Sequence, residues 1–257
     1  MEIIIKIIKR DKTILNSLDK KEEKMVILFN WILEFRFSTP RILAKVLELK
    51  ITSTPRFFSG LIKDGFIKKV RNVHTDKERL FMLTQLSVDF LEVREFDVSN
   101  AITKAGRLER YSMILHDIGV QDVICSKMNT HSEVVWDKHI IGIDSKCRPD
   151  ALMKKVSNGY LVGIEYERWR KSLGRIYSSF VNHSNQMVEG NYGGVYFIFN
   201  SDIDLIHYKK MFDSERWPLF SKHAGTGKLS HTDKFFYPDE IKNLRKGFIF
   251  EVLPCEL

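Results

Sequence analysis

Residues 148–172 read RPDALMKKVSNGYLVGIEYERWRKS. Two largely apolar segments, 148–155 and 160–167, flank the turn sequence SNG, so the stretch predicts a β-hairpin. Charged residues stand at its open end. Because a buried charge is costly unless it is paired or binds a metal, four residues need an explanation: Asp150, Glu165, Glu167 and Lys171.

The segments on either side of the hairpin predict an α/β sheet with helices on both faces. Residues 194–200, GVYFIFN, are apolar almost throughout, which is typical of a strand buried on both faces. Hydrophobic spacing predicts the remaining elements, which are helices 104–117, 168–187 and 202–211, and strands 120–125, 134–136, 139–141 and 247–253.

The first 95 residues follow a different pattern, in which Ser38 is the expected N-cap of a second helix. Three helices and a two-stranded hairpin in this order predict a winged helix-turn-helix over residues 1–95, preceded by a short strand or arm at 3–8. The expected elements are helices 22–37, 38–49 and 54–63, strands 66–71 and 79–84, helix 87–93, and a polar linker at 94–103.

A winged helix can place its third helix in the major groove of DNA while the hairpin rests on phosphates. The third helix carries Arg56, Ser59 and Lys63 at its polar positions. The hairpin is basic, with Lys68, Lys69, Arg71, His74, Lys77 and Arg79. These residues predict DNA binding; the alternative is a winged helix used for protein contact or dimerisation.

Composition sets wider limits on the class of protein. The 257 residues carry a net charge of +8, which favours a polyanionic partner, nucleic acid before an anionic membrane surface. The three cysteines are isolated, so a disulfide framework or structural zinc site is not expected, and a reducing cytoplasm fits best. No run of 18 apolar residues occurs, so no membrane insertion is expected.

The charged residues of the 148–172 stretch are expected to meet at one sheet edge. Residues two apart on a strand face the same side, so the carboxylates of Glu165 and Glu167 lie together, with Asp150 on the neighbouring strand. Lys171 is expected on the first turn of the next helix, leaning back toward them. Carboxylates beside an ammonium suit a divalent cation, Mg²⁺ or Mn²⁺, in phosphodiester chemistry.

Pro149-Asp150, followed after fourteen residues by Glu165-x-Glu167, resembles the PD-(D/E)xK nuclease signature. The sequence departs from that pattern because Glu167 holds the usual lysine position, which Lys171 would then replace. The resemblance implies a restriction-endonuclease-like α/β domain over residues 104–257. It also implies a further site residue from the preceding helix, for which Glu109 and His116 rank above Asp117.

A narrower resemblance covers about residues 20–210. It rests on a winged helix, a following helix with a His-Asp pair, RPDA, an apolar strand ending in ExE, and a basic helix with Lys171-Ser172 and an arginine. It is to the replication-relaxation and plasmid-mobilisation group, in particular the MobC-type relaxases. The resemblance implies a DNA-nicking enzyme that cuts one strand at a plasmid origin of transfer, with an accessory mobilisation protein as a further partner. It implies Asp150, Glu165, Glu167 and Lys171 as catalytic residues, the three carboxylates as metal ligands.

Other interpretations of the same residues stay open. A restriction or transposon-end endonuclease shares the motif, and a regulator of plasmid replication can keep an inert nuclease fold for DNA binding. Glu165 and Glu167 are also compatible with an exposed edge paired with nearby arginines. Arg175 is expected to follow the DNA backbone, although basic residues on helices are more often simply solvated.

Overall fold

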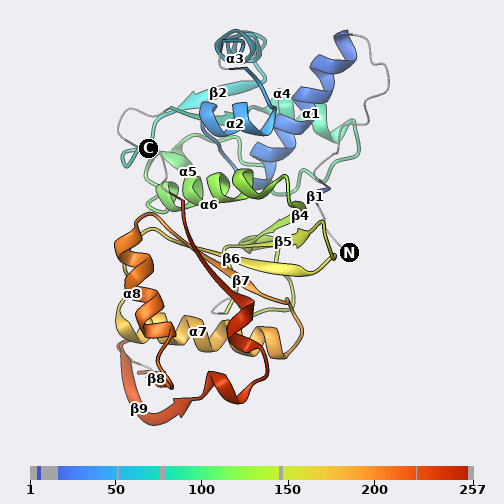
Figure 1. Cartoon of the computed structure of the whole chain (residues 1–257). Coiled ribbons are helices and arrows are strands. Elements are labelled where there is room, and N and C mark those ends of the chain that lie inside the picture. The colour runs from blue at the N-terminus through green and yellow to red at the C-terminus, as the bar shows by residue number, and fades with distance from the viewer. Residues whose placement is uncertain are drawn as a thin grey trace. The chain divides into compact units, whose positions relative to one another are not determined.

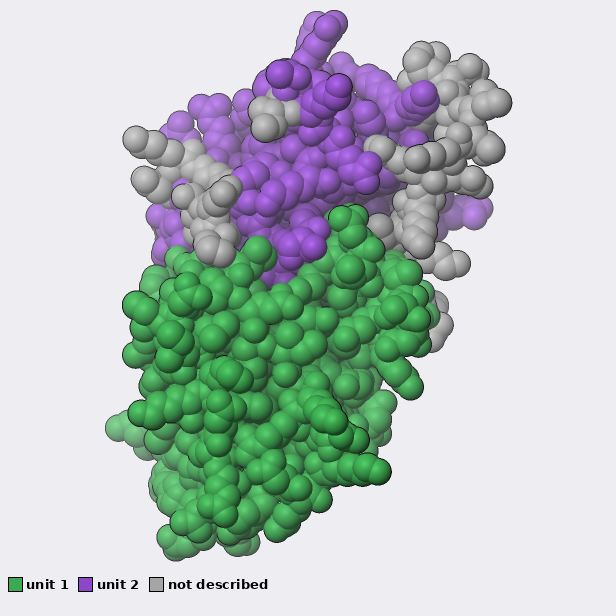
Figure 2. Space-filling model, in the orientation of Figure 1, with its two compact units in different colours: residues 1–7, 127–256 green, residues 8–126, 257 purple. Residues whose placement is uncertain are grey.

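The computed structural model describes residues 5–6, 17–50, 52–75, 79–144, 147–223 and 225–253. The chain forms two compact units, coloured separately in Figure 2: an N-terminal unit of residues 8–126 with 257, and a C-terminal unit of residues 127–256 with 1–7. The domain boundary expected from the sequence lay between residues 95 and 104, whereas this division falls after residue 126.

The N-terminal unit contains the expected order of three helices and a two-stranded hairpin (Figure 1). Thr39, and not the predicted Ser38, caps the second helix, because its side chain accepts a hydrogen bond from the Ile42 amide at 3.2 Å. Ser38 instead forms an isolated antiparallel bridge with Phe81 of the hairpin. The elements are α1 (Ser17–Phe35), α2 (Pro40–Val46), α3 (Thr54–Lys63), β2 (Ile67–Val70), β3 (Leu80–Leu83) and α4 (Gln85–Glu92).

The region after the linker corrects the sequence prediction. Of the expected helix 104–117, one part forms a short α5 (Gly106–Glu109) and residues 114–117 begin α6 (Ile114–Lys127). The expected strand 120–125 is wrong, because α6 continues through it. Residues of α6 are buried on nearly every side, so the segment lacks the polar stripe that marks an amphipathic helix. A short apolar run of this kind cannot be told from a buried strand by its periodicity.

Two buried polar residues of α6 hold it within the N-terminal unit. Gln121 accepts hydrogen bonds from Trp31 and Ser38 and donates one to the Phe37 carbonyl. Asp122 pairs with the guanidinium of Arg41, at 2.7 Å from its Nη1. These partners satisfy polar groups that would otherwise be costly to bury, which explains why the VQDVIC segment is part of a helix here.

The C-terminal unit is built on a six-stranded mixed sheet with strand order β1-β4-β5-β6-β7-β10. The pairs β1–β4, β4–β5 and β5–β6 are antiparallel, whereas β6–β7 and β7–β10 are parallel. Of the predicted arm at 3–8, residues 5 and 6 form β1, and the rest lies outside the described residues. The strands are β1 (Ile5–Lys6), β4 (His131–Trp136), β5 (Ala151–Lys155), β6 (Leu161–Glu167), β7 (Val195–Phe199) and β10 (Phe248–Val252).

The helices of this unit are α7 (Leu173–Val188) and α8 (Asp202–Phe212). α7 begins five residues later than the predicted start at 168, which leaves residues 168–172 as a loop. The strand predicted at 139–141 is also wrong, because residue 139 ends a short 3₁₀ helix, η1 (Asp137–His139), and residues 140–141 belong to no strand. In the described residues, no helix has the length and apolar character needed to cross a membrane.

An aromatic core fixes α7 and α8 against the sheet. Phe180 of α7 is fully buried, with its ring centroid 5.5 Å from those of Phe197 on β7 and Phe212 on α8. The strand pairs Glu165↔Phe197 and Glu167↔Phe199 place the two glutamates level with these aromatic positions. The carboxylates at the end of β6 therefore stand on a closely packed, rigid support.

A second hairpin, β8 (Trp217–Lys222) and β9 (Leu229–Phe236), was not predicted from the sequence. It contacts α7, which lies between it and the sheet (Figure 1). The close approach depends on Gly174, where a Cβ would come within 2.9 Å of the Phe220 ring. Two short 3₁₀ helices, η2 (Pro238–Glu240) and η3 (Leu244–Gly247), then lead into β10.

Candidate functional site

Asp150 and Glu165 lie beside each other at the end of the central strands. Ala151 pairs with Ile164, and the Asp150 amide donates to the Ile164 carbonyl at 2.9 Å, so Asp150 extends β5 next to Glu165. The Asp150 side chain is held from behind, because its Oδ2 accepts a hydrogen bond from the Tyr166 amide at 2.8 Å. The structure thus brings together the two carboxylates that the sequence placed on neighbouring strands.

Glu165 has both carboxylate oxygens near other side chains. Its Oε1 lies 3.2 Å from Nε2 of His183 on α7, and its Oε2 lies 3.7 Å from Nζ of Lys171. His183 is buried, and its other ring nitrogen, Nδ1, lies 2.6 Å from the hydroxyl of Tyr192. Burial raises the pKa of Tyr192, which keeps the hydroxyl protonated and able to donate to Nδ1. His183 Nε2–H can then donate to Glu165.

His183 and Tyr192 are site residues that the sequence reasoning missed. The available signal was the position of His183 on α7, where it shares the buried face with Ile176 and Phe180. A histidine on the apolar face of a helix is more often a satisfied core residue than part of a site. Only the contact with Glu165, eighteen residues away in sequence, distinguishes the two cases here.

Lys171 lies in the loop before α7, and not on the first helical turn as predicted. Its amide donates to the hydroxyl of Tyr208 on α8 at 3.3 Å, which anchors the loop. Its ammonium reaches the carboxylates from there, with Nζ 2.6 Å from Oε1 of Glu167. The ammonium of Lys171 therefore points toward the carboxylates, as predicted. It does so because of the loop conformation, and not because helical side chains tilt toward the N-terminus.

Glu167 is 2% exposed. This burial raises the pKa of the Glu167 carboxyl to about 7, against the opposing attraction of Lys171. Burial alone would lower the pKa of Lys171, but the charges of Glu165 and Glu167 outweigh it and raise the pKa. Lys171 is therefore a permanent cation, with 34% of its side chain still exposed.

A pocket of about 350 Å³ opens beside these groups. Asp150, Glu165 and Lys171 line it together with two arginines, Arg148 and Arg175, whereas Glu167 does not. Ser178, Ser179, Asn182 and His183 of α7 also line it, as do Cys147 and, on β9, Leu229. The pocket therefore presents two carboxylates, three cations and several neutral hydrogen-bonding groups to a bound molecule.

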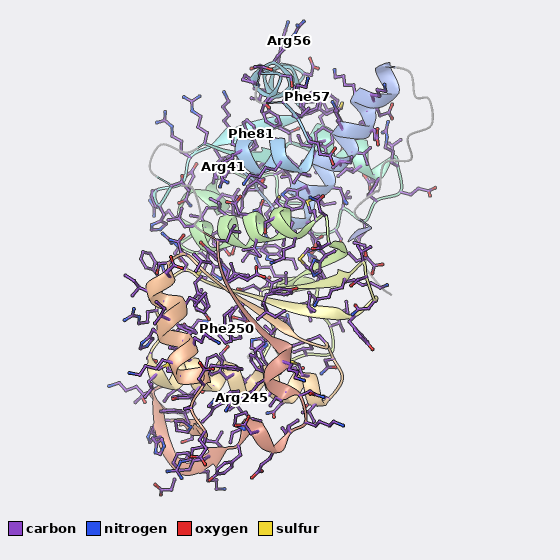
Figure 3. All side chains as sticks on the ribbon, viewed as in Figure 1. Arg41, Arg56, Phe57, Phe81, Arg245 and Phe250 are labelled. Carbon is purple, nitrogen blue, oxygen red and sulfur yellow. The ribbon has the colours of Figure 1, made fainter. Side chains whose placement is uncertain are left out.

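The residues predicted to bind DNA in the N-terminal unit are mostly exposed. Arg56, Ser59 and Lys63 share one exposed face of α3, at the helical spacing i, i+3, i+7, and Arg56 projects outward in Figure 3. In the hairpin, Lys69 and Arg71 are exposed, while Lys68 donates a hydrogen bond to the Thr103 carbonyl. Lys77 lies outside the described residues.

Glu109 and His116, the other predicted site residues, belong to the N-terminal unit. Glu109 is exposed at the end of α5. His116 has its Nδ1 3.4 Å from Oδ1 of Asp117, a buried carboxylate that also accepts from the Tyr111 hydroxyl at 2.9 Å. A role for Glu109 or His116 beside Asp150 stays a prediction.

No family model matches this sequence, and no curated protein does. Among solved structures, the chain is similar to a cysteine-to-serine mutant of Lactococcus lactis ZitR in complex with DNA. The two are 15% identical, and the match covers 50% of this chain and 80% of that chain. Its TM-score is 0.25, which is too low to support a conclusion about fold or function.

Proposed function

We propose that the protein is a metal-dependent nuclease that nicks DNA, with a PD-(D/E)xK-like site at the open end of β5 and β6. The observation that carries the proposal is the pocket that Asp150, Glu165 and Lys171 share. The element order also supports the proposal. A β4-β5-β6 meander is followed by α7 and then by β7, which pairs parallel with β6, as expected for a nuclease domain of this type.

The carboxylates fit a hard divalent cation such as Mg²⁺ or Mn²⁺. Mg²⁺ sites commonly use one or two protein carboxylates and complete the shell with water and substrate phosphate. Asp150 and Glu165 meet that requirement at the pocket wall, although the described residues contain no group of three His, Cys, Asp or Glu arranged around one ion. The cation would polarise the phosphate and activate a water molecule.

The protein's own residues then have distinct roles. Asp150 and Glu165 supply oxygen ligands, held by the Tyr166 amide and by His183. Lys171 faces the pocket as a compact cation and can stabilise the charge that develops on the scissile phosphate. Arg148 and Arg175 can hold the flanking phosphates, and Ser178, Ser179 and Asn182 can bond the sugar or base.

We assign Glu167 a role that differs from the metal ligand implied by the resemblance. It lies behind the pocket wall, and its Oε1 is 2.6 Å from Lys171 Nζ. Glu167 therefore positions Lys171, which occupies the place that a lysine at position 167 would take directly. This arrangement explains chemically how the Glu165-x-Glu167 sequence can serve a site whose family pattern has a lysine there.

The N-terminal unit is proposed to be a winged helix that locates the DNA site. Its third helix exposes Arg56, Ser59 and Lys63 on one face, as groove recognition requires. The finer assignment, a MobC-type relaxase that cuts one strand at an origin of transfer, rests on the resemblance of RPDA, ExE and Lys171-Ser172. The accessory mobilisation protein and the cytoplasmic location belong to the same proposal.

One plasmid assay tests the proposal. Supercoiled plasmid with a candidate origin is incubated with the protein and Mg²⁺ or Mn²⁺, and EDTA serves as the control. An origin-dependent open circle supports the relaxase assignment, and a linear product supports a restriction or transposon-end endonuclease. DNA binding with no cleavage in either metal would leave the inert regulator of replication as the function.

A double replacement in α3, Arg56→Ala with Lys63→Ala, is expected to weaken duplex binding and flatten its salt dependence. Each lost phosphate contact lowers the slope of log affinity against log salt by roughly 0.9, so the pair should lower it by about 1.8. The measurement is a fluorescence anisotropy titration at several salt concentrations. Replacement of Lys20 and Lys104, exposed lysines outside α3 and the hairpin, is the matched control. An unchanged slope would indicate that α3 faces a protein partner.

His183→Ala is expected to weaken Mn²⁺ binding by roughly 10- to 100-fold, because it removes the group that orients Glu165. Tyr192→Phe should act in the same direction with a smaller effect, since it removes only the partner of His183. Affinity is measured by Mn²⁺ titration of the protein without DNA, and thermal unfolding checks the fold.

Two further variants serve as controls. His183→Gln keeps a donor near Glu165 and should restore part of the Mn²⁺ affinity. His231→Ala on β9 should leave the Mn²⁺ affinity unchanged. Equal Mn²⁺ affinity in His183→Ala and wild type would contradict this role.

A further inference from the structure

Trp169 is the exposed exception among the four tryptophans of the chain. The exposed fractions of Trp31, Trp136 and Trp217 are 7%, 3% and 0%, whereas that of Trp169 is 69%. A single exposed apolar side chain is common and needs no explanation by itself. The position of this one does, because it lies two residues after Glu167 and two before Lys171.

We propose that Trp169 is a stacking platform for an unpaired base of single-stranded DNA next to the scissile phosphate, an inference that rests on the proposed nuclease function. Two residues of chain span at most about 7 Å, so the Trp169 backbone is held close to that of Lys171. A ring in this place can stack on a base adjacent to the phosphate at the pocket. Stacking tolerates any sequence, because every base has a π-face.

The loop that carries Trp169 is fixed at both ends. Before it, Glu167 pairs with Phe199 in the sheet. After it, Nε of Arg170 lies 3.0 Å from Oδ1 of Asp204, and the Lys171 amide bonds the Tyr208 hydroxyl. These contacts hold the chain before and after Trp169, while its side chain is 69% exposed. A platform that is already ordered loses little conformational freedom when a ligand binds.

The charges around the ring suit a polyanion. The guanidinium of Arg168 lies 4.5 Å from the centroid of the Trp169 ring, within the range of a cation–π contact. Arg170 and Lys171 follow directly in the sequence, where Arg170 is paired with Asp204 and Lys171 with Glu167. An aromatic ring flanked by cations is the combination that single-strand-binding grooves use, with the cations on the phosphates and the ring on the base.

The burial of the other three tryptophans allows a direct test in EDTA, where no cleavage occurs. Intrinsic fluorescence is followed while a single-stranded oligothymidylate of about ten nucleotides is added. We expect saturable quenching that disappears in Trp169→Phe, since the remaining tryptophans are buried. An oligonucleotide of the same length with abasic sites has the same phosphates without bases, and it should quench weakly. Quenching of equal size by the abasic strand would overturn the stacking assignment.

Affinity provides the second measurement. Trp169→Ala should bind the oligothymidylate roughly tenfold more weakly, within the range for loss of one base–aromatic stack, while duplex affinity changes little. Leu173→Ala, an exposed apolar residue at the start of α7, is the matched control and should bind normally. Unchanged single-strand affinity in Trp169→Ala would overturn the proposal.

These results are separable from the nuclease proposal. Base-dependent quenching in a protein that nicks no plasmid would support the platform and reject the nuclease. Normal nicking by wild-type protein, together with no base-dependent quenching, would reject the platform and leave the nuclease intact.

Discussion

Asp150→Ala and Glu165→Ala, made separately, are each expected to reduce Mg²⁺- or Mn²⁺-dependent nicking by roughly a thousandfold or more. Each replacement removes a ligand oxygen at the pocket wall, and metal stabilisation of a phosphoryl transition state is worth several kcal/mol, at 1.36 kcal/mol per tenfold in rate. DNA binding should stay nearly intact, because neither residue is a phosphate-binding cation. The measurements are the rate of open-circle formation and an anisotropy titration.

Isosteric variants separate chemistry from folding in this experiment. Asp150→Asn keeps an oxygen that can accept from the Tyr166 amide, and Glu165→Gln keeps an oxygen facing His183. Both should unfold near the wild-type temperature and still fail to nick. Glu215→Ala, an exposed carboxylate of the same unit, should nick normally. Full activity in Asp150→Ala and Glu165→Ala would show that the active site is elsewhere.

Lys171→Ala is expected to reduce the nicking rate by about a hundredfold or more, in line with the loss of one donor that stabilises the transition state. Lys171 is the cation that contacts both Glu165 and Glu167 and also lines the pocket. Without the attraction of Lys171, the pKa of the buried Glu167 should rise further. Glu167 is then neutral, and the fold carries no unpaired buried charge. Metal affinity should therefore change little, or rise as a positive neighbour is removed from Glu165.

The shape of the cation provides the control for Lys171. Lys171→Arg should rescue activity poorly, because a planar guanidinium does not replace a compact ammonium in a confined site. Lys210→Ala is the matched control; Lys210 is an exposed lysine of α8 that does not line the pocket, so nicking should persist. If Lys171→Ala nicks at the wild-type rate with normal metal dependence, the migrated-lysine proposal fails. Arg175, which lines the pocket, then becomes the next candidate.

Several features of the fold could be predicted because they depend on local patterns. The SNG turn between two apolar segments determines the β5–β6 hairpin, and the two-residue period of a strand places Glu165 and Glu167 on one face. Helical spacing, with Pro55 in the first turn and Gly65 after the end, predicts α3 (Thr54–Lys63), although Ser53 makes no side-chain capping hydrogen bond. The apolar run at 194–200 determines β7, which is buried along its whole length.

Other features could not be predicted, because their causes lie far away in the sequence. The segment 120–125 is helical since Gln121 and Asp122 meet Trp31 and Arg41, about eighty to ninety residues earlier. The β8–β9 hairpin was missed because its strands are largely half-buried or exposed, without a clear alternation. Its place on α7 depends on the absence of a side chain at Gly174.

In the candidate site, Asp150 and Glu165 could be placed at one sheet edge from a short continuous stretch, because strand pairing and side-chain alternation are local. What these carboxylates contact depends on tertiary packing. Lys171 reaches them because Tyr208, 37 residues later, holds its loop, and Glu165 is oriented by His183 because an aromatic core presses α7 against the sheet. Such contacts join segments that only packing brings together, so no local pattern encodes them.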